Sequence, residues 1–278
     1  MKKFVFAILC EIDHEKEAWT NIGYLVSSLN KLKKLNVSVE LFDLKDAATA
    51  IETIKDISPD FIGLSILQFN LISSLNFIRE AKKCLNNSYI IIGNVLPSVH
   101  SIEIMTDCPE IDCTVIGEGE NTIVDLCECI LNNKSLENCN GIAYRNGSEI
   151  IKNNLREPVK DLDTLPYPDR SHCNDGKFGF YSIIASRGCD GHCTFCDANT
   201  IYRHTNCSSG VRYRSIENVV DEIEVLQKNN NAKKIYFVDS TFGDENRLDI
   251  LNKCLLNRKI IIPMKMNLRC DLISDNYC

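Results

Sequence analysis

The sequence has no long apolar run. Its longest ones, such as Phe4–Cys10 and Tyr89–Gly93, fall well short of the roughly 18 to 20 residues that a membrane helix needs. The N-terminal MKKFVFAILCEIDHEKE has two lysines before a short apolar run, as signal peptides do, but no small-residue cleavage site follows. We therefore expect this run to be a buried strand, the protein to be cytoplasmic, and no membrane to be among its partners.

The sequence also lacks an excess or a stripe of positive charge. It has 31 Lys and Arg against 38 Asp and Glu, a net charge of −7, and its basic residues are scattered in small groups. Nucleic acid is therefore not expected as a partner, and a small-molecule or peptide substrate is favoured. A phosphate-binding GxxxxGKS/T loop and a GxSxG nucleophile elbow are also missing, so neither enzyme class is indicated.

Cysteine, in contrast, is abundant, with 15 residues in 278. A secreted disulfide scaffold would be much shorter and would carry a signal peptide, so a disulfide framework is not expected. We expect most cysteines outside residues 189–196 to be small core residues. So many thiols are typical of an anaerobic lineage and predict an oxygen-sensitive protein.

Residues 1–135 alternate between apolar strands and amphipathic helices, which predicts one α/β domain. Strict alternation implies right-handed βαβ crossovers and a doubly wound, Rossmann-like parallel sheet. The run FIGLSIL after Pro59 is continuously apolar, as in a strand buried on both faces. The expected strands are residues 4–10, 37–44, 61–67, 88–93 and 112–116, and the expected helices are residues 15–35, 47–57, 71–85 and 122–131.

Residues 136–175 interrupt this alternation and are predicted to be a hairpin and a linker. The hairpin signal is Asn146-Gly147 between alternating segments, and DLDTLPYPDR, with its two prolines, is typical of an inter-domain linker. Alternation resumes in residues 176–278, where Ser215 is expected to cap the first helix. Three βα units do not close a barrel, so this domain is predicted to be only the N-terminal part of a TIM-like barrel. Its expected strands are residues 180–186, 233–241 and 260–268, and its expected helices are residues 215–227 and 245–256.

Three cysteines, Cys189, Cys193 and Cys196, lie directly after the first strand of the second domain. A loop this short lets all three thiolates reach one metal centre, and Gly188 and Gly191 let the backbone fold around it. Barrel enzymes carry their chemistry on loops at the carboxyl ends of the strands, which is where this loop is expected to lie. The spacing therefore predicts a metal site.

Iron and zinc are the two metals to weigh. A structural zinc site needs four ligands, and here His192 or Cys207 would supply the fourth at a spacing that is not a familiar zinc pattern. A 4Fe–4S cluster held by three cysteines instead leaves one iron open to a substrate or cofactor. Ligand number and spacing together favour iron–sulfur, with zinc as the alternative.

The loop CDGHCTFC, residues 189–196, resembles the cluster loop of the radical S-adenosylmethionine (SAM) enzymes, CxxxCxΦC with Φ aromatic. The resemblance implies that the three cysteines ligate a 4Fe–4S cluster and that Phe195 lies against the adenine of SAM; plain packing would explain Phe195 equally well. In that family the open iron binds the methionine end of SAM, and one-electron reduction yields a 5′-deoxyadenosyl radical. An electron donor such as flavodoxin or ferredoxin is implied as a partner.

Segments downstream of the loop are similar to the same family. VRYRSIENVVDEIEVL resembles its first barrel helix, IYFVDSTFGDENR its second strand and turn, and MNLRCDLIS its third strand. The resemblance implies that Asp239, Ser240 and Thr241 face SAM and that Arg269 stands at the position of a recurrent arginine. An acid or an arginine at a strand end is also often an ordinary solvated residue, and that alternative applies here.

The first domain resembles the cobalamin-binding domain that precedes the radical domain in one large subfamily. The similar segments are residues 21–44, 59–67, 90–98 and 115–126, followed by the linker at residues 162–170. The resemblance implies that cobalamin is bound. The positions implied to contact it are Ser65, Leu67, Gly93, Gly117, Glu118 and Gly119.

Two features depart from the cobalamin-binding pattern. The DxHxxG loop is absent, as in radical relatives that bind cobalamin without a histidine beneath cobalt, and the usual Gly-Gly after the fourth strand is Gly93-Asn94 here. A doubly wound domain that has lost its ligand is therefore the alternative. Helix capping would also explain the two carboxylates of GEGE, residues 117–120, as well as catalysis would.

The resemblance implies a cobalamin-dependent radical SAM enzyme, most plausibly a methyltransferase acting on an unactivated carbon. Cyclisation or rearrangement fits the same motifs, and a binding module without turnover is the competing class. Related enzymes continue through several more βα units that carry most of the substrate pocket. We therefore expect a missing C-terminal half to complete this region, and no catalytic side chain is assigned from the sequence.

Overall fold

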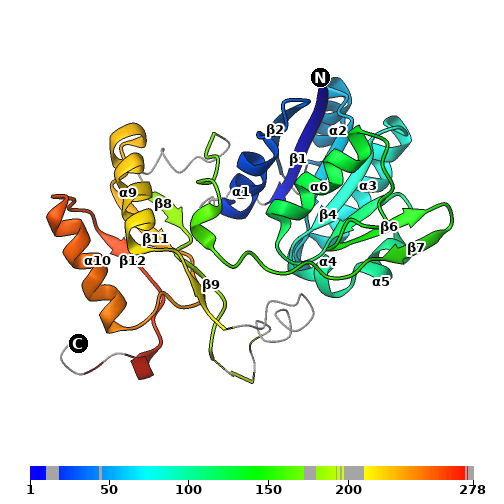
Figure 1. Cartoon of the computed structure of the whole chain (residues 1–278). Helices are drawn as coiled ribbons and strands as arrows, with labels where there is room; N and C mark the ends of the chain where they lie inside the picture. The colour runs from blue at the N-terminus through cyan, green and yellow to red at the C-terminus, as the bar shows by residue number, and fades with distance from the viewer. Residues whose placement is uncertain are drawn as a thin grey trace.

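The computed structural model of the chain describes residues 1–10, 19–43, 46–171, 180–191, 193, 194, 196, 210–272 and 274. It forms two α/β halves joined by an extended segment (Figure 1). The first half contains every strand from β1 to β7, and the second half contains β8 to β12. The predicted architecture, a doubly wound sheet followed by the start of a parallel barrel-type sheet, is confirmed.

The first half is built on a seven-stranded sheet with the order β2-β1-β3-β4-β5-β6-β7. Strands β1 to β5 are parallel, whereas β6 and β7 form an antiparallel hairpin that extends the sheet beyond β5. The hairpin turns at Gly147, whose φ of +62° suits glycine. The strands are β1 Lys2–Cys10, β2 Leu35–Asp43, β3 Phe61–Ser65, β4 Tyr89–Gly93, β5 Cys113–Val115, β6 Ile142–Asn146 and β7 Glu149–Lys152; the helices are α1 Thr20–Leu29, α2 Ala47–Ile57, the short 3-10 turn η1 Gln68–Asn70, α3 Leu71–Cys84, α4 Val95–Val99, α5 Ser101–Asp107 and α6 Gly119–Leu131.

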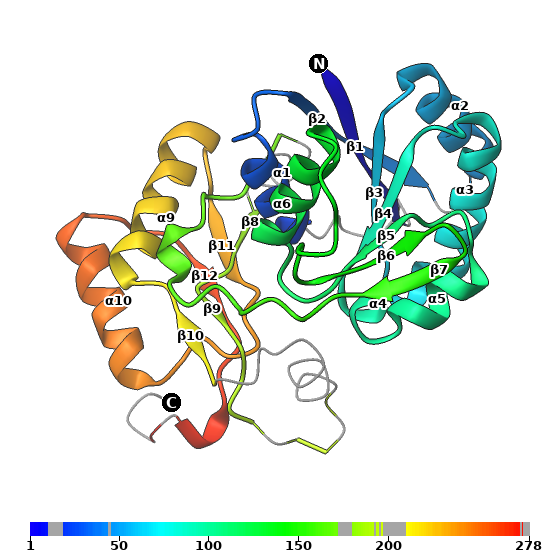
Figure 2. The same cartoon turned by 45° about the vertical axis from the view of Figure 1, so that its right-hand side comes forward.

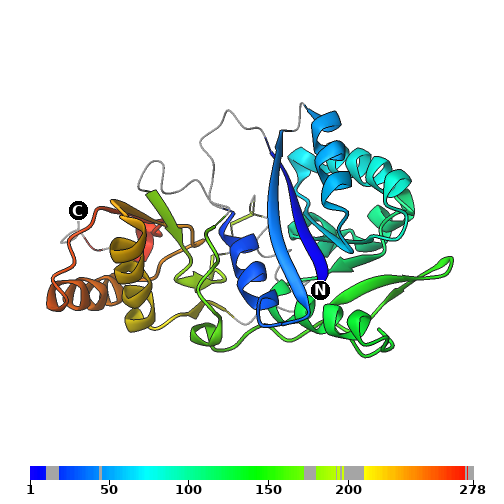
Figure 3. The same ribbon diagram turned by 90° about the horizontal axis from the view of Figure 1, so that it is seen from above.

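Alternating side chains of β1 fill two separate cores. Val5, Ala7 and Leu9 pack with α2, α3 and α5 on one face of the sheet, while Phe4 and its alternate neighbours pack with α1 and α6 on the other. Figure 3, seen from above, shows the α2–α3 layer and α1 on opposite sides of β1. The continuously apolar strands expected from the sequence are therefore buried on both faces.

The structure differs from the sequence prediction between β4 and β5. Residues 95–107 form two short helices, α4 and α5, where no helix was predicted. The break at His100 and the proline at Pro97 leave segments of only five and seven residues, which are too short for a clear helical period.

The second half contains a three-stranded parallel sheet with the order β12-β11-β8. Both of its long helices lie on the side of this sheet that faces away from the first half (Figure 2), and they close a third core. The predicted third strand is much shorter than expected, because the backbone pairing around Pro263 leaves only two residues in the ladder. The elements are η2 Leu162–Thr164, β8 Phe180–Ile183, β9 Ser186–Arg187, β10 Arg212–Tyr213, α9 Ile216–Asn230, β11 Lys234–Phe237, α10 Glu245–Asn257, β12 Met264–Lys265 and η3 Cys270–Leu272.

Helix α9 begins as predicted. The Ser215 side chain accepts a hydrogen bond from the backbone N–H of Asn218, which satisfies one of the free donors at the helix start. The same N-cap arrangement recurs at α10, where Asp244 accepts from the N–H of Arg247.

The linker fastens the two halves to each other. The hydroxyl of Ser27 on α1 donates to the Tyr167 carbonyl (2.7 Å), and the Asp169 N–H donates to the Gly23 carbonyl (3.0 Å). A Cβ added at Gly23 would lie 2.4 Å from the Asp169 carbonyl oxygen, so the linker crosses α1 where only glycine fits. On its other side, the Tyr167 hydroxyl donates to the Asn218 carbonyl of α9 (3.1 Å).

No helix within the described ranges combines the length and the apolar character needed to cross a bilayer. The cytoplasmic location stays a prediction.

Candidate functional site

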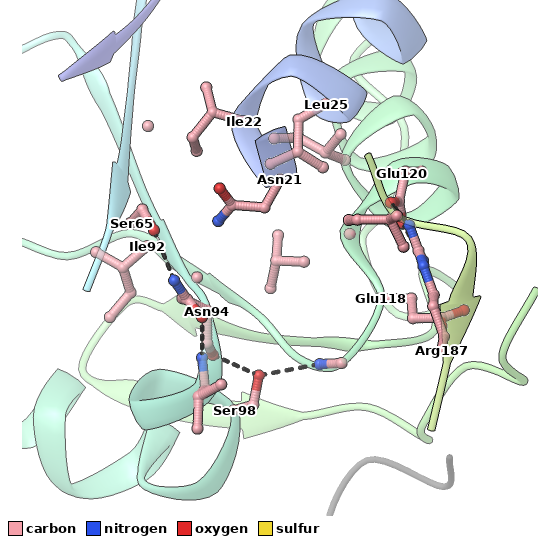
Figure 4. Close-up of a pocket in the computed structure, with 18 of the residues that line it drawn as sticks. Asn21, Ile22, Leu25, Ser65, Ile92, Asn94, Ser98, Glu118, Glu120 and Arg187 are labelled. Atoms are coloured by element: carbon pink, nitrogen blue, oxygen red, sulfur yellow. Dashed lines mark hydrogen bonds and ion pairs between the residues drawn. The ribbon is translucent and has the colours of Figure 1, made fainter. Parts of the chain in front are cut away.

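A cavity of about 360 Å³ lies where the carboxyl ends of strands from both halves meet. Its first wall comes from the ends of β3, β4 and β5 and from α1, and its second wall comes from residues that follow β8 and β11. In open α/β sheets this edge is the usual ligand-binding edge. Figure 4 shows the cavity with Ile22 and Leu25 of α1 above it and polar groups gathered at two separate ends.

Most positions predicted for cobalamin line the first wall. Ser65, Gly93 and the Gly117–Gly119 segment all contact the cavity, so residues from three different strand ends converge as predicted. Leu67 does not line it: the chain has already turned into η1, and the Leu67 N–H donates to the Asn70 side chain (2.8 Å).

One end of the cavity carries a chain of neutral polar groups that begins at Asn94 (Figure 4). The Asn94 amide nitrogen donates to the Ser65 hydroxyl (2.8 Å), the Ser98 hydroxyl donates to the Asn94 carbonyl (2.7 Å), and the Gly117 N–H donates to the Ser98 hydroxyl oxygen (3.1 Å). Sequence reasoning did not select Asn94 or Ser98 as site residues. The one sequence feature that pointed to Asn94 was its place in Gly93-Asn94, where the cobalamin-binding pattern has Gly-Gly.

Asn94 has φ +91° and ψ −170°, a region that is almost confined to glycine. A residue held there costs about 1–3 kcal/mol unless its surroundings compensate. Here the side chain bonds both Ser65 and the N–H of Val95, which supplies that compensation. The backbone thus follows the path of the glycine pattern while an amide group points into the cavity.

The other end of the cavity is ionic and joins the two halves. Glu118 and Glu120, at the start of α6, face Arg187 and Arg212 of the β9–β10 ribbon. The Arg187 guanidinium lies 2.5 Å from a Glu120 oxygen and 3.2 Å from a Glu118 oxygen, and Arg212 lies 2.6 Å from Glu118. All four residues line the cavity.

Glu118 is held ionised by this environment. Burial acts to raise the pKa of its carboxyl, but the hydrogen bond from Arg212, the charge of Arg187 and the N–H of Val159 together lower the pKa below its usual value. The carboxylate makes no capping hydrogen bond to α6, so helix capping does not explain it.

Two of the three residues predicted to face SAM after β11, Asp239 and Ser240, line the second wall. Thr241 is buried beside them and does not line it. One Asp239 oxygen accepts from the N–H groups of Ala185 (2.8 Å) and Ser186 and from the Ser186 hydroxyl (3.0 Å). Its second oxygen is buried and has no hydrogen-bond partner among the described residues, and burial raises the pKa of this carboxyl to about 6, against the effect of the hydrogen bonds.

The cysteine loop begins immediately beyond the cavity. A Cβ added at Gly191 would lie 3.3 Å from the Cys189 sulfur, 3.8 Å from the Cys193 sulfur and 3.0 Å from a guanidinium nitrogen of Arg269. The predicted Arg269 therefore stands beside two of the predicted ligands. The Cys196 N–H donates to the Cys193 carbonyl (3.1 Å), which folds the loop back on itself.

Within the described part of the chain, no three His, Cys, Asp or Glu side chains are arranged to hold a single metal ion. Phe195, together with His192 and Cys207, lies outside the described residues. Of the other described cysteines, Cys108, Cys113, Cys127 and Cys139 are buried in the first half, and burial raises the pKa of each thiol. Three more are half-buried, and Cys84 and Cys270 are exposed, so the core prediction holds for four of these nine.

Comparison with known proteins agrees with this arrangement. Residues 21–127 match the B12 binding domain family. The 4′-phospho-dehydrooxetanocin synthase of Priestia megaterium is 30% identical over 85% of this chain and 33% of its own length, and an uncharacterized methyltransferase of Pyrococcus horikoshii is 24% identical over 80% of this chain and 48% of its own. The chain therefore spans half or less of these relatives.

Among solved structures, the cobalamin-dependent SAM radical enzyme OxsB with aqua-cobalamin bound matches 95% of this chain and 38% of its own, with a TM-score of 0.76 and 27% identity. One match thus runs continuously through the B12-binding half and the cysteine-loop half. Over nearly its whole length the chain is therefore similar to radical SAM proteins with an N-terminal B12-binding domain.

The residues present fit the cofactors that radical SAM proteins of this kind imply. The sulfurs of Cys189 and Cys193 both lie close to Gly191, and because glycine has no side chain the space next to both sulfurs stays open. At the cavity, Gly93 brings bare backbone to the wall, while Ser65 and Asn94 offer polar groups and Ile22, Leu25 and Ile92 offer apolar ones. A large ligand with an apolar ring and a polar fringe suits such a wall.

Proposed function

We propose that this chain is the N-terminal part of a cobalamin-dependent radical SAM enzyme that cleaves SAM reductively at a 4Fe–4S cluster. Methyl transfer to an unactivated carbon of a small molecule or peptide is the reaction we favour. The required electron would come from a donor such as flavodoxin or ferredoxin. The division into a cobalamin-binding domain (1–135), a hairpin and linker (136–175) and a radical domain (176–278) belongs to the same proposal.

The observation that carries this proposal is the shared cavity. Ser65 and Gly93 from the B12-binding half and Asp239 and Ser240 from the second half line a single space, and Gly188 on its wall is bonded directly to Cys189. A reaction that needs both cofactors requires this proximity, because reacting groups must be held next to each other.

The proposal assigns roles to the residues described above. Cys189, Cys193 and Cys196 would hold the cluster; Asp239, Ser240, Thr241, Arg269 and Phe195 would contact SAM; Ser65, Leu67, Gly93, Gly117, Glu118 and Gly119 would contact cobalamin. When bound, the cluster supplies the electron for SAM cleavage, and cobalamin supplies a carrier for a methyl group.

The test is anaerobic reconstitution with iron and sulfide, followed by dithionite and SAM. We expect a brown iron–sulfur chromophore and 5′-deoxyadenosine, together with measurable equilibrium binding of SAM and hydroxocobalamin. Cys193→Ala should abolish the chromophore and the 5′-deoxyadenosine, whereas Cys84→Ala, at an exposed position on α3, should leave both unchanged. A wild-type protein with neither product would refute the enzyme.

Cyclisation or rearrangement is the second candidate, since the relative at 30% identity is named a synthase and not a methyltransferase. SAM labelled in its methyl group separates the two. Label on cobalamin or on an added acceptor supports methyl transfer, and 5′-deoxyadenosine formation without methyl loss supports the second candidate. SAM binding without any cleavage would indicate a binding module.

A further inference from the structure

The cysteine loop has a narrow neck made by the β9–β10 ribbon. Arg187 and Arg212 flank residues 188–211 in the sequence, and they are direct partners in the antiparallel register of the separate two-stranded β9–β10 sheet. Like charges placed directly opposite each other in a ribbon repel and destabilise it. The neck therefore needs negative charge from elsewhere to hold its shape.

That charge comes from the other half of the molecule. Glu120 meets Arg187, and Glu118 meets both arginines, so two carboxylates balance two guanidinium groups. All four side chains are largely buried: Glu118 is 14% exposed, Glu120 6%, Arg187 16% and Arg212 11%. Pairs shielded to this extent are much less screened by salt than exposed ones.

The ionic group is also closed by backbone contacts. Arg212 donates to the Val159 carbonyl (2.5 Å), and the Val159 N–H donates to the same Glu118 carboxylate (2.7 Å). Arg187 additionally lies over the ring of Tyr24 on α1, 5.6 Å from its centroid. The neck is thus held from the linker, from α1 and from the start of α6.

We propose that Glu118 and Glu120 are positioning residues that fasten the neck of the cysteine loop, Arg187 and Arg212, to the B12-binding half, so that filling the cavity and closing the neck are coupled. All four ionic side chains line the cavity, so a ligand there lies next to the groups that hold the neck. This inference rests on the proposed function only for the identity of that ligand.

Hydrogen exchange measured on the metal-free protein tests the fastening without any cofactor. Glu120→Gln should accelerate amide exchange about tenfold in peptides that cover residues 184–188 and 210–214, relative to wild type. Glu128→Gln, on the exposed face of the same helix, is the matched control and should leave exchange unchanged. Equal exchange in the two variants would overturn the fastening.

Hydroxocobalamin tests the coupling. In the wild type, its addition should slow exchange in the same peptides, and in Glu120→Gln this protection should be lost at hydroxocobalamin concentrations that saturate the variant. The same protection in both proteins would overturn the coupling. A reconstituted cluster adds a second readout, since the spectrum of the reduced cluster should respond to cobalamin in the wild type and not in the variant.

Two further measurements keep the proposal open to refutation. If Glu120→Gln does not fold, Arg212→Gln on the other strand of the neck carries the same expectation. If the wild type binds no cobalamin, the proposed function and the coupling fail, but the exchange comparison between Glu120→Gln and Glu128→Gln still decides whether the neck is fastened.

Discussion

The two halves bury polar groups of different kinds. Among the described residues of the first half, the buried polar side chains are neutral, with Glu120 as the exception, and Glu120 pairs with an arginine of the second half. The second half buries Arg214, Glu222 and Asp239 within a much smaller sheet. A neutral group needs one hydrogen bond nearby, whereas a buried charge needs a counter-charge as well.

The second half obtains its counter-charges from distant segments. Glu222 on α9 binds Arg214 at one oxygen (2.6 Å) and Arg170 of the linker at the other (2.7 Å), and these three side chains are almost fully buried. Arg214 also donates to the Ile184 carbonyl at the end of β8 (2.8 Å). The smaller half therefore depends on the linker for part of its polar core, whereas the single buried carboxylate among the described residues of the larger half, Glu120, is paired across the boundary.

The largest expected effect comes from breaking this core. Glu222→Gln leaves Arg170 and Arg214 without their buried carboxylate, which should lower the free energy of unfolding of the second half by about 3–5 kcal/mol. Urea unfolding followed by probes in each half measures it. Glu217→Gln, exposed in the first turn of the same helix, should cost less than about 1 kcal/mol, and equal losses in the two variants would contradict the comparison.

The next largest effect is the pH dependence of stability that Asp239 causes, which differs from that of the carboxylates paired with arginine. Its pKa is raised to about 6, so the native state binds its proton more tightly than the unfolded state does. The resulting stabilisation is complete below the ordinary pKa of 3.8 and is lost as the pH rises through 6, a loss of about 3 kcal/mol.

Asp239→Asn removes this dependence while keeping an oxygen acceptor for Ala185 and Ser186. As the pH rises from 4 to 7, the unfolding free energy of the wild type should therefore fall relative to that of Asp239→Asn. Glu118→Gln should show the opposite trend, because the lowered pKa of Glu118 makes its contribution present above pH 4.5 and lost below it. Parallel pH profiles for the two variants would refute the assignment.

The smallest effect concerns the neutral end of the cavity. Asn94→Ala keeps a Cβ at φ +91° but removes the amide that compensates for it, whereas Asn94→Gly removes the Cβ too. We expect the alanine variant to be less stable than the glycine variant by about 1–2 kcal/mol in thermal or urea unfolding. An alanine variant as stable as the glycine variant would show that this backbone is not strained.

Features set by local sequence patterns could be predicted from the sequence. The βα order of the first half and helix Ala47–Ile57 follow from apolar periodicity, which is local, and Ser65, Gly93 and Gly117 follow because parallel strands end at one edge. The strand predicted at residues 61–67 ends at Ser65, because the chain turns into η1 earlier than expected, with the Leu67 N–H bonded to the Asn70 side chain.

The ionic part of the site was not predictable in this way. Arg187 and Glu120 are 67 residues apart, and Arg212 and Glu118 are 94 apart, so no local pattern relates them. For the carboxylates of GEGE the sequence therefore left helix capping and catalysis as equal explanations, with Glu118 also implied as a cobalamin contact. The structure instead places these carboxylates against the neck of the cysteine loop.

Because Glu118 and Arg212 lie far apart in the sequence, they are synthesised at different times. At about 5–20 residues per second, the ribosome adds Arg212 roughly 5–20 seconds after Glu118. Until residues 184–188 are made, late in that interval, the cavity has only one wall, and residues 238–240 are added only after Arg212. Each newly made chain therefore offers the B12-binding edge to its surroundings before the second half covers it.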